Sequence, residues 1–114
     1  MENIIYNELR IRGYSVDVGQ VKVRIINDDG KKIRKLLEMD FICNSGNKRV
    51  YIQSVLDMPT QEKIDQETNS LRHIKDGFPK IVIVGGLTPS HVNADGISII
   101  NVIDFLKDTE GNLL

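Results

Sequence analysis

The segment from Leu37 to Val55 constrains the fold of this 114-residue chain more than any other stretch. Apolar residues occupy every second position of its first half: Leu37, Met39, Phe41 and Cys43. This period of two predicts a strand with one buried face. Asn44-Ser45-Gly46-Asn47 is typical of a tight turn in which the glycine takes a positive φ. The β-branched and aromatic run from Arg49 to Val55 predicts a second strand, so the segment predicts an antiparallel hairpin.

Two polar residues interrupt this apolar hairpin, Asp40 in the first strand and Gln53 in the second. A polar side chain in such a place needs a hydrogen-bonding partner or a function. Two interpretations stay open: a pair that hydrogen-bonds within the hairpin, or part of a ligand-binding site. Cys43 alternates with Phe41, which favours a small buried apolar residue over a reactive thiol.

The rest of the chain predicts an α/β fold, a mixed β-sheet flanked by helices in the order helix, antiparallel strands, helix, core strand, strand and short helix. Helices are expected over Glu2–Arg12, from an N-cap at Thr60 to a stop at Gly77 and Pro79, and over Val102–Lys107. Further strands are expected over Tyr14–Val18, Gln20–Ile26, Lys80–Val84 and Ile97–Asn101, with a bulge or bend at Gly19 and a turn at Asp28-Asp29-Gly30. Because Lys80–Val84 is continuously apolar, it predicts a strand buried on both faces. The last residues, Thr109–Leu114, are expected to fray.

Composition predicts one domain over residues 1–114 with an ordinary soluble balance of 40% apolar and 27% charged residues. The net charge of −1 gives no overall attraction to nucleic acid or anionic membrane. The chain shows neither a membrane-spanning run nor a basic leader after Met1, so no membrane partner and a cytoplasmic location are expected. With two histidines and one cysteine, and no GxxxxGK(S/T), GxSxG, HExxH or paired CxxC motif, we expect no nucleotide hydrolysis, no triad and no resident cofactor.

A basic cluster follows the Asp28-Asp29-Gly30 turn, and two further cations begin the second hairpin strand. The candidate nucleic-acid residues are Lys31, Lys32, Arg34, Lys35, Lys48 and Arg49. Their functional interpretation is phosphate contact. The alternative is an exposed hairpin arm whose charges deter pairing with other strands, and it is favoured because the rest of the chain is not basic.

Several ordered motifs carry a family resemblance. They are Glu2-Asn3-Ile4-Ile5-Tyr6, Gly30-Lys31-Lys32, Leu37-Glu38-Met39-Asp40-Phe41, Tyr51-Ile52-Gln53-Ser54 and Asp104-Phe105-Leu106. The first helix and the Asp40 hairpin resemble those of PD-(D/E)XK nucleases, notably archaeal Holliday-junction resolvases. Taken together, over nearly the whole chain, the motifs resemble the C-terminal domain of a large prokaryotic family of predicted AAA-type ATPases. This resemblance implies a restriction-endonuclease-like core preceded by a nucleotide-binding module.

The resemblance also implies which residues matter. In nucleases of this fold, two acids on the hairpin strands and an acid on the first helix hold Mg²⁺, and a lysine two residues after the second acid assists the reaction. Asp40 and Glu2 match acidic positions, and they are the weak metal candidates. Gln53 stands at the second acid, and Val55 stands at the lysine. An amide brings no charge and valine brings no cation, so Glu2, Asp40 and Gln53 are expected to be a vestigial site.

Three functional hypotheses follow. The first is a non-catalytic accessory domain that contacts an upstream ATPase module or another protein. The second is a residual metal-dependent nuclease that uses Mg²⁺ at Glu2, Asp40 and Gln53. The third is a nucleic-acid-binding module that uses the basic candidates. The first helix begins almost at Met1, which suggests a longer natural chain, and an isolated domain would then be expected to self-associate through exposed apolar surface.

Overall fold

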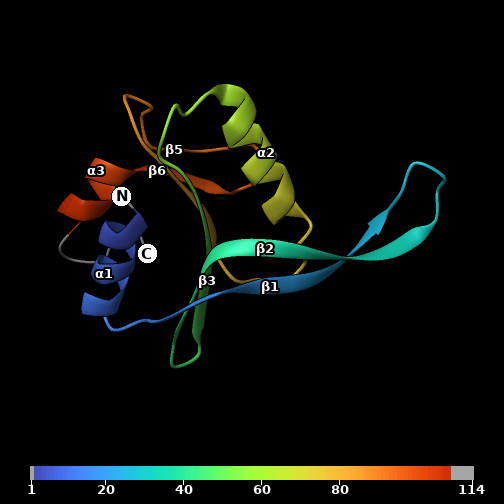
Figure 1. Ribbon diagram of the computed structural model, residues 1–114, viewed down its shortest axis with the longest axis horizontal. Helices are drawn as coiled ribbons and strands as arrows, with labels where there is room; N and C mark the ends of the chain where they lie inside the picture. The colour runs from blue at the N-terminus through green and yellow to red at the C-terminus, as the bar shows by residue number, and fades with distance from the viewer. Residues whose placement is uncertain (1, 109–114) are drawn as a thin grey trace.

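The computed structural model describes residues 2–108, and it confirms a mixed β-sheet flanked by helices (Figure 1). Its elements, in chain order, are α1 (Glu2–Ile11), β1 (Ser15–Ile26), β2 (Lys32–Ser45), β3 (Lys48–Val55), α2 (Gln61–Arg72), β4 (Lys80–Val84), β5 (His91–Val92), β6 (Ser98–Asn101) and α3 (Val102–Lys107). The predicted fraying of Thr109–Leu114 lies outside the described residues. Within residues 2–108, no helix is both long and apolar enough to cross a membrane.

The six-stranded sheet has the order β1-β2-β3-β4-β6-β5. The first three strands form an antiparallel meander, whereas β4 pairs parallel to both β3 and β6. Helix α2 therefore serves as the crossover that a parallel β3–β4 pair requires. The short strand β5 pairs antiparallel to β6 at the far edge.

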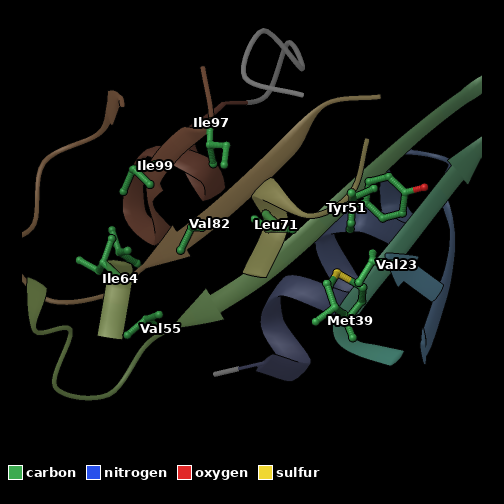
Figure 2. Close-up of a cluster of buried hydrophobic side chains, with 12 residues drawn as sticks. Val23, Met39, Tyr51, Val55, Ile64, Leu71, Val82, Ile97 and Ile99 are labelled. Carbon is green, nitrogen blue, oxygen red and sulfur yellow. The ribbon is translucent and has the colours of Figure 1, made fainter. Parts of the chain in front are cut away.

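The strand β4 divides the hydrophobic core into two layers. Ile81 and Ile83 face the layer that contains α1 and α3, and Val82 and Val84 face the layer that contains α2. Figure 2 shows the α2-side layer, to which Leu71 of the helix and Val82 of β4 both belong. The prediction that this strand is buried on both faces is confirmed, as expected for a central parallel strand.

The helix α1 is fixed to α3 by one arginine. The Arg12 guanidinium donates from Nη2 to the carbonyl of Phe105 at 2.6 Å and lies 4.5 Å from the centre of its ring. Its Nε also donates to Glu8 at 3.0 Å. Because Ile5 and Leu9 of α1 are fully buried in the same layer, the first turn of α1 is held against the sheet. This packing decides where Glu2 lies.

The helix α2 begins as predicted and ends earlier than predicted. The Thr60 side chain accepts a hydrogen bond from the Lys63 amide at 3.2 Å, which confirms the N-cap. The helix ends at Arg72, so the expected stop at Gly77 and Pro79 was wrong. The Asp76 carboxylate accepts from the Phe78 amide at 3.0 Å and builds a local turn instead of another helical turn.

The first hairpin also differs from its prediction, since β1 is one continuous strand rather than two. The register shifts between Asp17, which pairs with Ile42, and Gly19, which pairs with Met39. The predicted irregularity at Gly19 is confirmed, but the additional residue belongs to β2. Two residues of β2, Asp40 and Phe41, thus stand opposite one residue of β1, which is a β-bulge.

This bulge overturns the simple alternation expected along β2. Leu37 and Met39 pack in the α2-side layer, whereas Phe41 and Cys43 pack in the α1-side layer. An additional residue moves every later side chain to the opposite face of the sheet. At Asp40, the buried side chains of β2 therefore switch from the α2-side layer to the α1-side layer.

Candidate functional site

The candidate site forms where β2 and β3 stop pairing. The pairing of β2 with β3 ends at the bulge, where Phe41 pairs with Ile52. Beyond it, the main chain of β3 continues beside β4, and β2 continues beside β1 alone. The predicted candidates Asp40 and Gln53 lie on the two sides of this divergence.

Gln53 closes the gap between the diverging strands. Its Oε1 accepts a hydrogen bond from the Asp40 amide at 2.9 Å, and its Nε2 donates to the Glu38 carbonyl at 2.8 Å. The residue is 4% exposed. The side-chain amide thus replaces the ladder contacts that the main chain of β3 no longer makes. The interpretation of a hydrogen-bonding pair within the hairpin is confirmed, and it runs through the backbone of Asp40 rather than its carboxylate.

The Asp40 carboxylate bonds to Ser54 instead. Its Oδ2 accepts from the Ser54 amide at 2.8 Å and lies 3.0 Å from the Ser54 hydroxyl. The same hydroxyl lies 3.3 Å from Oε1 of Glu2, in the first turn of α1. A serine hydroxyl has one hydrogen, so the two carboxylates compete for it. The structure therefore brings Glu2 and Asp40 together, as the resemblance implied, with Ser54 between them.

A hollow of about 370 Å³ opens beside Ser54. Its lining residues are Glu2, Asn3, Ser54, Leu56 and Asp57. The hollow is open to solvent on the α1 side of the sheet, and Asp57 is the second acidic residue of its wall, beside Glu2. Its polar character suits water or a polar ligand more than an apolar one.

Val55 has no part in this hollow. It is 7% exposed and packs in the α2-side layer with Ile64 and Val84. Successive side chains of a strand point to opposite faces, so Val55 faces away from Ser54. At the position where the resemblance expects a lysine, Val55 is thus a residue of the hydrophobic core.

A second acid approaches Asp40 from α2. Burial, together with the nearby negative charge of Asp40, raises the pKa of Glu67 above its ordinary value. Sequence reasoning missed both Glu67 and Ser54. Two features of the sequence could have indicated them. Glu67 falls between Ile64 and Leu71 on the apolar stripe of α2, and Ser54 interrupts an apolar strand.

The arrangement does not fit a divalent cation held in the way the resemblance implies. Among residues 2–108, no three side chains of His, Cys, Asp or Glu lie close enough together to hold a metal ion. Glu2 and Asp40 supply two carboxylates. The carbonyl oxygen of Gln53, which would be the third protein ligand, is already bonded to the Asp40 amide. Mg²⁺ demands near-octahedral oxygen ligands, and this set offers it a poor site.

Cys43 is confirmed as a buried core residue. It is 0% exposed, and it packs beside Phe41 in the α1-side layer. Burial, with a smaller contribution from Asp17, raises the pKa of its thiol to about 12. A thiol of this kind is a poor nucleophile at neutral pH.

The predicted basic candidates do not form one surface. Lys31, Lys32, Arg34 and Lys35 lie at one end of β2, whereas Lys48 and Arg49 lie beyond its other end, at the start of β3. The Arg49 Nε donates to Asn44 at 2.8 Å. The two groups therefore cannot act as a single contact patch.

Comparison with known proteins finds similarity to a bacterial protein. No protein-family model matches this chain. The chain is similar to a Haemophilus influenzae protein described as an uncharacterized protein, with 38% identity over 106 residues. The match covers 93% of this chain and 22% of that protein, so the chain spans about a fifth of the relative's length.

Proposed function

We propose that this chain is a non-catalytic accessory domain of a predicted AAA-type ATPase, with a restriction-endonuclease-like core and a degenerate site. The element order supports the core assignment. A first helix, an antiparallel meander of β1–β3, the crossover α2 and the parallel strand β4 follow one another as the resemblance implies. Asp40 and Gln53 flank the divergence of β2 and β3, which matches the expected site position.

One observation carries the non-catalytic part of the proposal: residues at two catalytic positions hold the fold together instead. Both polar atoms of the Gln53 amide are bonded to the backbone of β2. Val55 is packed against α2. Phosphodiester hydrolysis needs a cation held by sufficient negative charge and a cationic group beside the attacking water. Gln53 removes one negative charge from the pattern, and Val55 removes the cationic group.

The ATPase part of the proposal rests on the resemblance and on the length of the relative. In the Haemophilus influenzae protein, the matching segment is 22% of the chain, so most of that protein lies outside the match. We propose that a nucleotide-binding module accompanies this domain, in the same polypeptide or as a partner.

Affinity capture of the natural gene product at its native expression level tests this part. The captured material is identified by mass spectrometry, with an untagged strain as the control. The proposal expects a stoichiometric P-loop ATPase, either fused to the domain or bound to it. If neither the gene product nor any stoichiometric partner contains a P-loop, the ATPase assignment is wrong.

A residual nuclease is the second candidate, and one observation favours it. The carboxylates of Glu2 and Asp40 do converge on Ser54 at the edge of the hollow. If a cation were bound there, it would have to supply the charge stabilisation that Gln53 and Val55 do not. The cleavage assay that closes the Discussion separates this candidate from the accessory domain.

A further inference from the structure

The β1–β2 ribbon projects from the rest of the molecule as a two-stranded arm (Figure 1). β3 pairs with β2 only from Phe41 to Ser45, and no strand of the described chain pairs with the outer edge of β1. From Gln20 to Glu38 the arm is thus a two-stranded ribbon that no other described strand flanks, although Val23 and Leu37 near its base are buried in the α2-side layer. Neither proposed function uses this arm.

The register of the arm sorts its cations by face. Residues directly opposite one another in an antiparallel pair share a face. Val23 pairs with Lys35, and since Val23 belongs to the α2-side layer, Lys35 lies on that face. The opposite face is formed by the pairs Lys22 with Leu36, Arg24 with Arg34, and Ile26 with Lys32.

This second face, which we call the cationic face, carries Lys22, Arg24, Lys32 and Arg34, all exposed. None of these cations lies within ion-pairing distance of a carboxylate anywhere in residues 2–108. The acids of the arm lie at its ends, with Glu38 at the base and Asp28 and Asp29 in the terminal turn. Glu38, opposite Gln20, shares the cationic face only at its base, so four positive charges without an ion-pair partner among residues 2–108 form a band on a protein whose net charge is −1.

The pairing of Arg24 with Arg34 is the most informative contact in this band. Like charges directly opposite one another destabilise a strand pair. In this position they would be favourable if an anion bound across both strands, because planar guanidinium groups bind phosphate well. The exposed Ile26 and Leu36 lie among the cations on the same face and offer apolar contacts.

We infer that the cationic face binds duplex DNA through its phosphates, independently of the degenerate site. The major groove of B-form DNA is wide enough to admit a two-stranded ribbon. The deep, narrow major groove of A-form RNA does not admit such a ribbon, which favours DNA as the partner. The cations that matter are then Lys22, Arg24, Lys32 and Arg34. Lys35, Lys48 and Arg49 lie elsewhere.

Fluorescence anisotropy with a labelled 25-base-pair duplex of mixed sequence tests this inference on the full chain. Affinity is measured between 50 and 200 mM salt. Four phosphate contacts predict a slope of log K against log salt of about −3.6. The double variant Arg24→Gln/Arg34→Gln should reduce the slope to about −1.8 and weaken binding roughly 60-fold at 0.1 M salt.

A matched double variant, Lys35→Gln/Lys63→Gln, removes the same charge from exposed positions off the cationic face. It should keep the wild-type slope, and both variants should keep the wild-type thermal melt. Absence of binding at 50 mM salt, equal losses in the two double variants, or tighter binding to duplex RNA of the same length would each overturn the inference.

Discussion

Replacing Gln53 by alanine tests whether this residue holds the diverging strands together. The substitution removes hydrogen bonds of 2.9 Å to the Asp40 amide and 2.8 Å to the Glu38 carbonyl. An unsatisfied buried group costs about 1–3 kcal/mol. With the lost packing, the unfolding free energy should fall by about 2–4 kcal/mol. That is a large fraction of the roughly 5–15 kcal/mol typical of a domain.

The assay is thermal unfolding followed by circular dichroism. For a chain of this size, a loss of 2–4 kcal/mol lowers Tm by roughly 8–16 °C. The matched control is Gln66→Ala, on the exposed face of α2, where the change should stay within about 0.5 kcal/mol. If Gln53→Ala has the same Tm as the control variant, the amide does not hold the strands together, and the interpretation of Gln53 as a structural residue is refuted.

Three further predictions concern stability. Gly85→Ala should be strongly destabilising, because a Cβ there would overlap a main-chain carbonyl of the loop after β3. In the control Gly77→Ala, the new Cβ meets nothing within 4 Å, so this variant should have the wild-type Tm. Equal Tm values for the two variants would contradict this. Ile83→Asp should unfold the domain, since an unpaired charge would be buried at a position that is 0% exposed. A variant with the wild-type circular dichroism melting curve would contradict the burial of β4 in the core. Burial alone would raise the pKa of Asp76, but hydrogen bonds from Tyr51, Lys80 and the Phe78 amide, together with the charge of Lys80, outweigh it and lower the pKa. The ionised carboxylate therefore stabilises the fold above its unfolded pKa, and this stabilisation is lost as the pH falls through the folded pKa. Asp76→Asn should thus have a lower Tm than wild type at pH 7, with a gap that narrows below about pH 4, and a gap independent of pH would contradict the assignment.

Much of the fold could be predicted because local signals and tertiary packing agree. The apolar run of β4 and the N-cap at Thr60 are such cases. The Asn44–Asn47 turn is another, with Gly46 at a φ of 59° as expected. In each case, the residue types that favour the local conformation also satisfy the burial that the fold imposes.

The rest depended on contacts that are distant in sequence. The bulge at Asp40 is invisible in the alternation of β2, because it exists only relative to β1. The sequence placed Asp40 and Gln53 in the same hairpin, but it could not show that the amide would bond to the backbone. The early end of α2 came from the Asp76 turn, which competes with helix after Arg72.

The most direct test of the central claim is a nuclease assay on the full chain with Mg²⁺ or Mn²⁺. Plasmid, single-stranded and branched DNA serve as substrates, and wild type is compared with Asp40→Ala. Losing one electrostatic stabiliser typically costs about a hundredfold to a thousandfold in rate. The nuclease resemblance expects an acid at position 53 and a lysine at position 55, and the lack of both need not cost the product of the two effects, because such groups act as a unit. We expect wild type to show no metal-dependent cleavage above the Asp40→Ala background, whereas metal-dependent cleavage that disappears in Asp40→Ala would contradict the non-catalytic assignment.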